Sequence, residues 1–328
     1  MKARLDYTEE CYDVIIVGGG PAGLTAGLYC QRAALKTLLI EKGLAGGQLA
    51  ISKEVENYPG MQGITGFELA EKMLRHAESF GLEVMRREVT QVEAGADVHT
   101  VGLAGGETLR SLSLILALGG TVRKLGIPGE AEYLGSGVSY CATCDGFFFK
   151  DKTVAVVGGG DTAAEEALYL AKLAKKVYHV HRKDELRASR LLQGRLKAEP
   201  VIEPVWNTVL TQIEGDETGV RAVALENIKT GEKGRLQVEG VFIFIGYAPN
   251  NALIPPGVRM NEQGFVITDD KCETNVAGVF VAGDLRQKYA NQIVIAAADG
   301  CTAALAAAHY VEGHKGMVPR HRCSHYQA

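Results

Sequence analysis

Two cysteines one helical turn apart, Cys141 and Cys144, are followed directly by an acid, Asp145. Thiols at this spacing can close a disulfide, which takes up or releases two electrons. A carboxylate beside a thiolate raises the pKa of the thiol, so we expect Asp145 to donate and accept protons and not to activate a thiol. The three residues therefore predict a redox-active dithiol with its own acid–base group.

Two glycine-rich loops each follow an apolar run and open a helix-like stretch. The first and second copies align without a gap at a shift of 140 positions, through second strands expected at residues 37–40 and 177–180. In a dinucleotide-binding βαβ unit, the first small residue permits the turn, the second lets the backbone approach a pyrophosphate, and the third keeps helix and strand close. The helix start then offers free amides to the phosphates. The candidate phosphate-site residues are Gly18, Gly20, Pro21, Ala22 and Gly23 in the first copy, and Gly158, Gly160, Asp161, Thr162 and Ala163 in the second.

The ends of the two second strands differ in charge, which separates the two ligands. Glu41 ends the first copy, and a carboxylate there accepts hydrogen bonds from a ribose diol, as FAD or NAD requires. His181 falls on the same place in the second copy and begins a basic cluster, which suits a 2′-phosphate and predicts NADP over NAD. A solvated basic strand end is the alternative, because two acids stand nearby. The cluster is His181, Arg182, Lys183 and Arg187, and the acids are Asp184 and Glu185.

Length and composition are those of a two-domain globular protein. The chain has 328 residues, of which 46% are hydrophobic and 23% charged, with a formal net charge of −4. This charge gives no reason to expect nucleic acid or an anionic membrane as partner. The apolar stretch 293–311 is interrupted by Asp299 and predicts a buried helix, and the first residues hold no apolar segment of signal-peptide type. Seven cysteines with one close pair are typical of a cytoplasmic protein with a catalytic dithiol.

Further segments give the chain a family resemblance. From about residue 13 to residue 311 it resembles the bacterial low-molecular-weight thioredoxin reductases. The dithiol hexapeptide and the glycine–aspartate segment near residue 284 are the most specific of these features. The segments are residues 46–49, 54–60, 125–129, 141–146 and 278–284.

The resemblance implies an α/β fold with two Rossmann-like dinucleotide-binding domains, the NADPH domain being inserted into a split FAD domain. The FAD domain would comprise residues 1–122 and 249–328, and the NADPH domain, which carries the dithiol, residues 123–248. The glycine- and proline-containing seams 119–129 and 246–256 would act as hinges, because one flavin face cannot hold the nicotinamide and the dithiol at once. A homodimer is also implied.

The resemblance further implies NADPH-dependent, FAD-mediated reduction of the disulfide of thioredoxin or a thioredoxin-like protein. Cys144 would face the flavin, and Cys141 would attack the partner's disulfide. The residues placed near the flavin by resemblance are Gly47, Gln48, Leu49, Asn57, Gly283, Asp284 and Gln292.

Three positions depart from the family pattern. Lys183 replaces a usual arginine, which keeps the charge and loses the planar fork that binds phosphate. Leu118 replaces a usual threonine near the domain junction, and Asn291 replaces an arginine before Gln292.

Other readings of the cysteines and of the function stay open. A structural zinc needs four ligands, and no second paired motif exists, so we expect no metal and expect Cys11, Cys30, Cys272 and Cys301 to be core thiols in strands or helices. The tail residues His314, His321, Cys323 and His325 could hold an adventitious ion, although a solvated terminus is expected.

The aromatic run after the dithiol fits either packing or protein docking; it consists of Phe147, Phe148 and Phe149. A ferredoxin-driven thioredoxin reductase, a flavin dithiol oxidase and a non-enzymatic redox sensor are the alternative functions.

Overall fold

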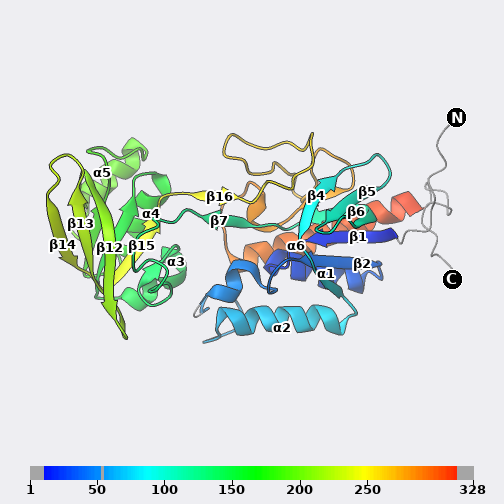
Figure 1. Cartoon of the computed structure of the whole chain (residues 1–328), viewed down its shortest axis with the longest axis horizontal. Coiled ribbons are helices and arrows are strands. Elements are labelled where there is room, and N and C mark those ends of the chain that lie inside the picture. The colour runs from blue at the N-terminus through cyan, green and yellow to red at the C-terminus, as the bar shows by residue number, and fades with distance from the viewer. Residues whose placement is uncertain (1–10, 53–54, 316–328) are drawn as a thin grey trace. The chain divides into compact units, whose positions relative to one another are not determined.

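The computed structural model describes residues 11–52 and 55–315. The chain divides into two compact units, one from Met1–Thr121 with Ala248–Ala328 and the other from Val122–Tyr247. The two strands at which the chain passes between the units, β7 (Gly120–Val122) and β16 (Tyr247–Pro249), pair as a two-stranded sheet (Figure 1).

The first unit is built on a seven-stranded sheet with the order β3-β2-β1-β6-β5-β4, and β17 also pairs with β6. Strands β3, β2, β1, β6 and β17 run parallel, and β4 and β5 add antiparallel pairs. Its elements are β1 (Cys11–Val17), α1 (Pro21–Arg32), β2 (Thr37–Glu41), η1 (Gly47–Ile51), α2 (Gly66–Ser79), β3 (Glu83–Arg86), β4 (Val89–Glu93), β5 (His99–Leu103), β6 (Thr108–Leu116), β17 (Val279–Val281), η3 (Gly283–Leu285) and α6 (Ile293–Lys315).

The second unit is built on a five-stranded parallel sheet with the order β11-β10-β9-β15-β8 and a three-stranded antiparallel sheet, β12-β13-β14. Its elements are β8 (Val138–Ser139), α3 (Ala142–Asp145), η2 (Gly146–Phe149), β9 (Thr153–Gly158), α4 (Asp161–Leu170), β10 (Lys176–Val180), α5 (Arg190–Ala198), β11 (Ile202–Val205), β12 (Thr208–Asp216), β13 (Gly219–Asn227), β14 (Lys233–Gln237) and β15 (Gly240–Phe244).

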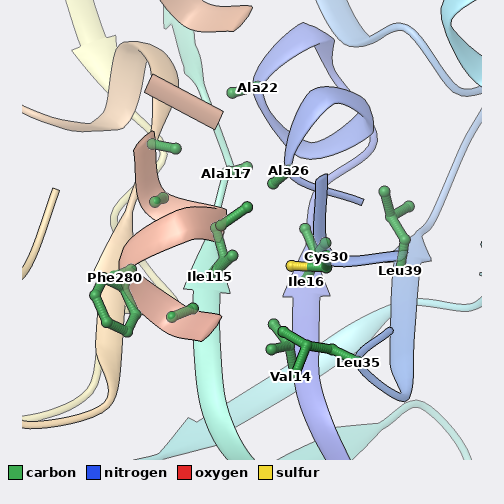
Figure 2. Packing of buried hydrophobic residues seen from close by; sticks show 14 of the residues in the cluster. Val14, Ile16, Ala22, Ala26, Cys30, Leu35, Leu39, Ile115, Ala117 and Phe280 are labelled. Carbon is green, nitrogen blue, oxygen red and sulfur yellow. The ribbon is translucent and has the colours of Figure 1, made fainter. Parts of the chain in front are cut away.

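Each parallel sheet has two buried faces, because successive strand residues point to opposite sides. In β1, Val14 and Ile16 pack with α1 and α6, whereas Ile15 and Val17 pack on the other face with residues of β4, β5 and β17. Figure 2 shows the first of these cores, with Cys30 of α1 pointing in among its aliphatic side chains. In β9, the same alternation sends Val154 and Val156 toward the helices and Ala155 and Val157 toward the β12-β13-β14 sheet.

The predicted βαβ repeat is confirmed. The second strands of the two copies, predicted at 37–40 and 177–180, form as Thr37–Glu41 and Lys176–Val180. Each pairs in parallel with the strand that precedes its glycine loop. Both units therefore show the α/β, Rossmann-like arrangement that the sequence predicts.

Among the described residues, one helix is long and apolar enough to cross a membrane, Ile293–His314 within α6. This helix packs on α1, and Ala303, Ala304, Ala307 and Val311 are buried in the core that α1 and α6 share. Burial of this face is what the sequence predicted for the stretch.

Candidate functional site

The two cysteines of the predicted dithiol form a disulfide. The sulfur atoms of Cys141 and Cys144 lie 2.06 Å apart, and their Cα atoms 5.3 Å apart. Cys141 has an extended backbone and caps the short helix α3, where its sulfur accepts a hydrogen bond from the Cys144 amide at 3.2 Å. Both cysteines are half-buried, so they are neither sealed in a core nor fully in solvent. The short helix α3 thus holds both sulfurs in bonding reach.

Asp145, the predicted acid–base group, is half-buried at the end of α3. The Ser139 hydroxyl donates to its carboxylate at 2.5 Å and also accepts from the Cys141 amide at 3.0 Å. Burial raises the pKa of Asp145, and the hydrogen bond from Ser139 acts in the opposite direction. A raised pKa favours the protonated acid, which is the form that can give a proton to a leaving thiolate.

Sequence reasoning missed a second acid beside the dithiol. Glu166 lies on α4, and its Oε2 accepts a hydrogen bond from the Ala142 amide at 3.1 Å, at the start of α3. Burial raises the pKa of Glu166, and hydrogen bonds from the Ala142 and Thr143 amides oppose the rise. Nothing in the local pattern of α4 distinguishes Glu166 from its exposed neighbour Glu165, because only tertiary packing of α3 on α4 gives it a role.

The aromatic run after the dithiol divides into two environments. Phe149 is buried and packs edge-on against Phe242, so its role is structural. Phe147 and Phe148 remain exposed next to the dithiol helix, Phe147 with 64% of its surface in solvent.

The first glycine loop is closed by backbone hydrogen bonds to Glu41. The Gly19 amide donates to Oε2 at 2.7 Å and the Gly43 amide to Oε1 at 2.9 Å. A Cβ at Gly23 would lie 1.9 Å from the Gly18 carbonyl oxygen, so only glycine permits this approach of α1 to the turn. Glu41 therefore stands at the loop, where sequence reasoning places a ribose-binding carboxylate.

Both helices that follow the loops begin without a side-chain cap. Their N-cap residues are Gly20 and Gly160, and a Cβ at either would meet nothing within 4 Å. Free amides behind open space suit a phosphate group. The residues that follow in the two first turns are Pro21 and Ala22, and Asp161, Thr162 and Ala163. Apart from Pro21, which has no amide hydrogen, the amides of these residues fit a dinucleotide pyrophosphate at each loop.

The short helix η1 lies against the first loop. The Gly46 amide donates to the Gly19 carbonyl at 2.7 Å, and a Cβ at Gly47 would lie 3.4 Å from the Gly20 Cα. Leu49 of η1 is buried. The structure thus places Gly47 at the same loop as the predicted phosphate site, whereas Leu49 packs with Leu69 and Ala70 of α2.

Two predicted amide side chains, from Gln48 and Asn57, contact distant parts of the first unit. Gln48 donates through Nε2 to the Gly120 carbonyl. Asn57 donates to Gln292 at 3.3 Å between Nδ2 and Oε1. The structure therefore brings Asn57 and Gln292 together from opposite ends of the chain.

The segment at Gly283 and Asp284 lies at the start of α1. Gly283 has a left-handed φ of +74°, and a Cβ there would lie 2.9 Å from the Ala22 Cβ. Asp284 pairs with Lys288 at 2.8 Å, and Lys288 also reaches Asp299 at 3.3 Å. Sequence reasoning missed Lys288 and Asp299 as neighbours of this segment, because in the sequence Asp299 stands out only as an interruption of an apolar run.

The basic segment of the second copy folds back onto its glycine loop. The Arg187 and Ala188 amides donate to the Gly159 carbonyl at 2.7 and 3.2 Å, and the Ser189 amide donates to Asp161 Oδ1 at 2.6 Å. The exposed members of the cluster are Arg182, Lys183 and Arg187. Their segment is thereby held next to the loop that would carry the phosphates.

The His181 ring is packed beneath the second glycine loop and is not exposed beside the other basic residues. It is buried, and a Cβ at Gly159 would lie 2.0 Å from its ring. Burial and the nearby arginines lower its pKa, which keeps the ring neutral at neutral pH. Among the described residues its Nε2 has no hydrogen-bond partner, so a ligand role for this atom stays a prediction.

The expectation of four core thiols was only half right. Cys30 and Cys272 are buried, whereas Cys11 and Cys301 are half-buried, and Cys272 lies outside any helix or strand.

Within residues 11–52 and 55–315, no group of three or more potential metal ligands occurs. The tail residues His321, Cys323 and His325 lie outside the described residues, as does residue 54 of the family-like segments.

Comparison with known proteins decides the family. Residues 12–300 match the family described as "Pyridine nucleotide-disulphide oxidoreductase". The chain belongs to this family. Among its curated relatives, the thioredoxin reductase of Bacillus subtilis is 45% identical over 93% of this chain and 96% of its own length, and that of Treponema pallidum is 46% identical over 93% and 98%. The solved thioredoxin reductase of Streptococcus pyogenes is 42% identical, covers 93% of this chain with all of its own, and has a TM-score of 0.90.

Within the pyridine nucleotide-disulphide oxidoreductases, the chain therefore belongs with the thioredoxin reductases. It is an oxidoreductase of the class that uses FAD and NADPH. The two uncapped helix starts agree with two dinucleotides, and the disulfide agrees with the family's redox chemistry.

Proposed function

We propose that this chain reduces the disulfide of thioredoxin, or of a thioredoxin-like protein, with electrons from NADPH. The observation that carries the proposal is the half-buried Cys141–Cys144 disulfide with a protonatable carboxyl at Asp145. When bound, FAD and NADPH supply hydride from the nicotinamide and two-electron transfer to the disulfide by way of the flavin.

The first unit would hold FAD and the second NADPH. For FAD, the proposal rests on the open helix start of α1, on Glu41 at the loop and on the Gly283–Asp284 segment beside Ala22. Further candidates are Gln48, Asn57 and Gln292. For NADPH, it rests on the open helix start of α4 and on the exposed Arg182, Lys183 and Arg187, whose charges suit a 2′-phosphate.

The two cysteines of the dithiol have different roles in the transfer of electrons to the protein substrate. The Cys141 thiolate attacks one sulfur of the substrate disulfide, and the other substrate sulfur leaves as a thiolate that takes a proton. Cys144 then attacks the Cys141 sulfur, which re-forms the Cys141–Cys144 disulfide and releases the second substrate thiol. Protonated Asp145 gives its proton to the first leaving sulfur, then accepts the proton of Cys144 and passes it to the second leaving sulfur, since its raised pKa keeps a proton available.

Substrate docking would use the exposed aromatic rings that follow the dithiol. Phe147 and Phe148 leave apolar surface in solvent next to α3, which suits a transient protein contact. We further propose a cytoplasmic homodimer, which static light scattering would report as about twice the 35.1 kDa chain mass.

The test of the dithiol compares the wild type with Cys141→Ser under anaerobic conditions. NADPH should bleach the flavin absorbance of both proteins, whereas only the wild type should reduce thioredoxin. Thioredoxin reduction by the variant at the wild-type rate would refute the proposed role of Cys141. Absence of bleaching in the wild type would favour a ferredoxin-driven enzyme or a dithiol oxidase.

The test of the nucleotide site compares bleaching by NADPH and by NADH at equal concentrations. Faster bleaching with NADPH is expected, because NADH lacks the phosphate that Arg182, Lys183 and Arg187 would bind. Equal rates would mean that this cluster does not discriminate between the two nucleotides.

A further inference from the structure

Glu166 takes the first amides of the helix that carries the dithiol. The Ala142 amide donates to Oε2 at 3.1 Å. The Thr143 amide, together with that of Ala142, opposes the rise that burial causes in the pKa of this carboxyl. Glu166 is held on α4, whose residues Tyr169 and Leu170 pack against Gly146 directly after α3. The contact therefore joins the dithiol segment to a rigid element of the same unit.

The amides at a helix start are the groups that ordinarily stabilise a cysteine thiolate at the N-cap. Cys141 is the N-cap residue of α3, so its thiolate would compete for these amides. The Ala142 amide is bonded to Glu166, the Thr143 amide acts on the pKa of the same carboxylate, and the Cys144 amide faces the Cys141 sulfur at 3.2 Å. A thiolate at Cys141 would thus receive little support from the helix, and the half-buried Glu166 carboxylate lies at the amide of the next residue, Ala142.

The other titratable groups around α3 act in the same direction. Asp145 belongs to α3 itself, and Glu166 of α4 accepts a hydrogen bond from the Ala142 amide. Tyr169 of α4 packs against Gly146, and Glu165 is exposed. From β8, Ser139 supplies a neutral hydroxyl. The two carboxyl groups that these contacts bring to the dithiol, Asp145 and Glu166, therefore disfavour additional negative charge on sulfur.

We propose that Glu166 is a positioning residue that keeps the dithiol strongly reducing, by occupying the first amides of α3 and disfavouring the Cys141 thiolate. This inference rests on the proposed function, in which the dithiol passes electrons to a protein disulfide. The couple is the Cys141–Cys144 disulfide plus two electrons and two protons giving two thiols. Above the thiol pKa, one proton fewer is taken up and a thiolate forms. Glu166 acts on that thiolate-containing reduced form, since the disulfide carries no charge.

The experiment compares three full-length, FAD-loaded proteins: wild type, Glu166→Gln and the matched control Glu165→Gln. The glutamine keeps an oxygen that accepts an amide hydrogen bond and removes the charge, whereas the control removes the charge of an exposed neighbour on the same helix. Each protein is equilibrated in glutathione redox buffers from pH 6 to pH 9.5. Its thiols are then trapped with a maleimide and counted by mass.

For Glu166→Gln we expect the dithiol to become easier to form at high pH. At pH values above the thiol pKa, the equilibrium between disulfide and dithiol should shift about ten-fold toward the dithiol, which corresponds to about 30 mV for two electrons. At pH values below the thiol pKa, it should change little. The pH midpoint for alkylation of Cys141 in the reduced protein should fall by about one unit. Glu165→Gln should match the wild type in both measurements.

An unmoved alkylation midpoint, or a shift of the same size at every pH, would overturn the inference, because either result means that Glu166 acts only on packing. The titration needs neither NADPH nor thioredoxin. Failure of the wild type to reduce thioredoxin would therefore refute the proposed function, whereas the effect of Glu166 on the dithiol could still be measured.

Discussion

At the scale of single residues, the acid beside the dithiol combines a chemical role with a cost in stability. Burial raises the pKa of Asp145 above its unfolded value, so the native state favours the protonated form. The free energy of unfolding therefore falls as pH rises from the unfolded pKa through the folded pKa, and it stays lower above it. A half-buried carboxyl with a raised pKa that lowers stability at neutral pH agrees with the proton transfer proposed for Asp145.

Asp145→Asn should separate these two effects. We expect thioredoxin reduction to slow by about 10²–10⁴-fold, the usual contribution of a positioned acid–base group. The Tm at pH 7 should be equal to or higher than that of the wild type, because the costly carboxylate is gone, and the difference should close toward pH 4. Thermal unfolding scans between pH 4 and pH 8, together with a coupled reduction assay, measure both.

Glu165→Gln on the exposed face of α4 serves as the control and should change neither the rate nor the Tm. A lower Tm for Asp145→Asn at pH 7 would contradict the argument, because it would show that the carboxylate stabilises the fold.

At the scale of elements, α2 illustrates how a local signal sets a boundary. Thr65 caps the helix: its hydroxyl accepts from the Glu68 amide at 3.1 Å, and the Glu68 carboxylate accepts from the Thr65 amide at 3.0 Å. This reciprocal arrangement satisfies two amides that the helix cannot satisfy itself.

Removing the cap with Thr65→Ala should lower the stability of the first unit by about 1 kcal/mol. Urea unfolding followed by release of flavin fluorescence would measure the loss. Ser79→Ala at the other end of α2 is the matched control, since its hydroxyl only donates to the His76 carbonyl and caps no amide. An equal loss in both variants would mean that the capping box contributes nothing specific.

The elements that the sequence could predict are those defined by local pattern. Apolar runs ending in glycine loops identify β1 and β9, and the 140-residue repeat identifies the second strands. Tertiary contacts have no such pattern. The bond from Ala142 to Glu166 and the pairing of Lys288 with Asp299 arise only when separate elements pack. His181 shows the same limit, since its place in the sequence matched a ligand position while packing put its ring beneath Gly159.

At the scale of the whole molecule, one βαβ design occurs twice and serves two nucleotides in the proposed function. The N-cap glycines Gly20 and Gly160 have φ of −72° and −95°, values that alanine also adopts. A Cβ at either position meets no protein atom within 4 Å and would project into the space before an uncapped helix. Alanine at these positions should therefore spare the fold and obstruct only the ligand.

Gly160→Ala should weaken NADPH binding by about ten-fold or more, because a methyl group would displace a phosphate from the helix amides. Its FAD content should equal that of the wild type. Gly20→Ala should show the reverse, with less FAD retained on purification. Absorbance at the flavin band reports FAD content, and anaerobic titration with NADPH reports affinity.

Gly194→Ala is the matched control, because Gly194 is an exposed glycine within α5 whose Cβ would also meet nothing within 4 Å. It should leave both ligands bound. Loss of FAD from Gly160→Ala would assign the second loop to the flavin and overturn the division of ligands between the units. Loss of both nucleotides in both variants would show that the two loops depend on each other for folding. The crossed pattern, with one nucleotide lost in each variant, follows only if each loop binds its own ligand, since the substituted positions otherwise have the same geometry.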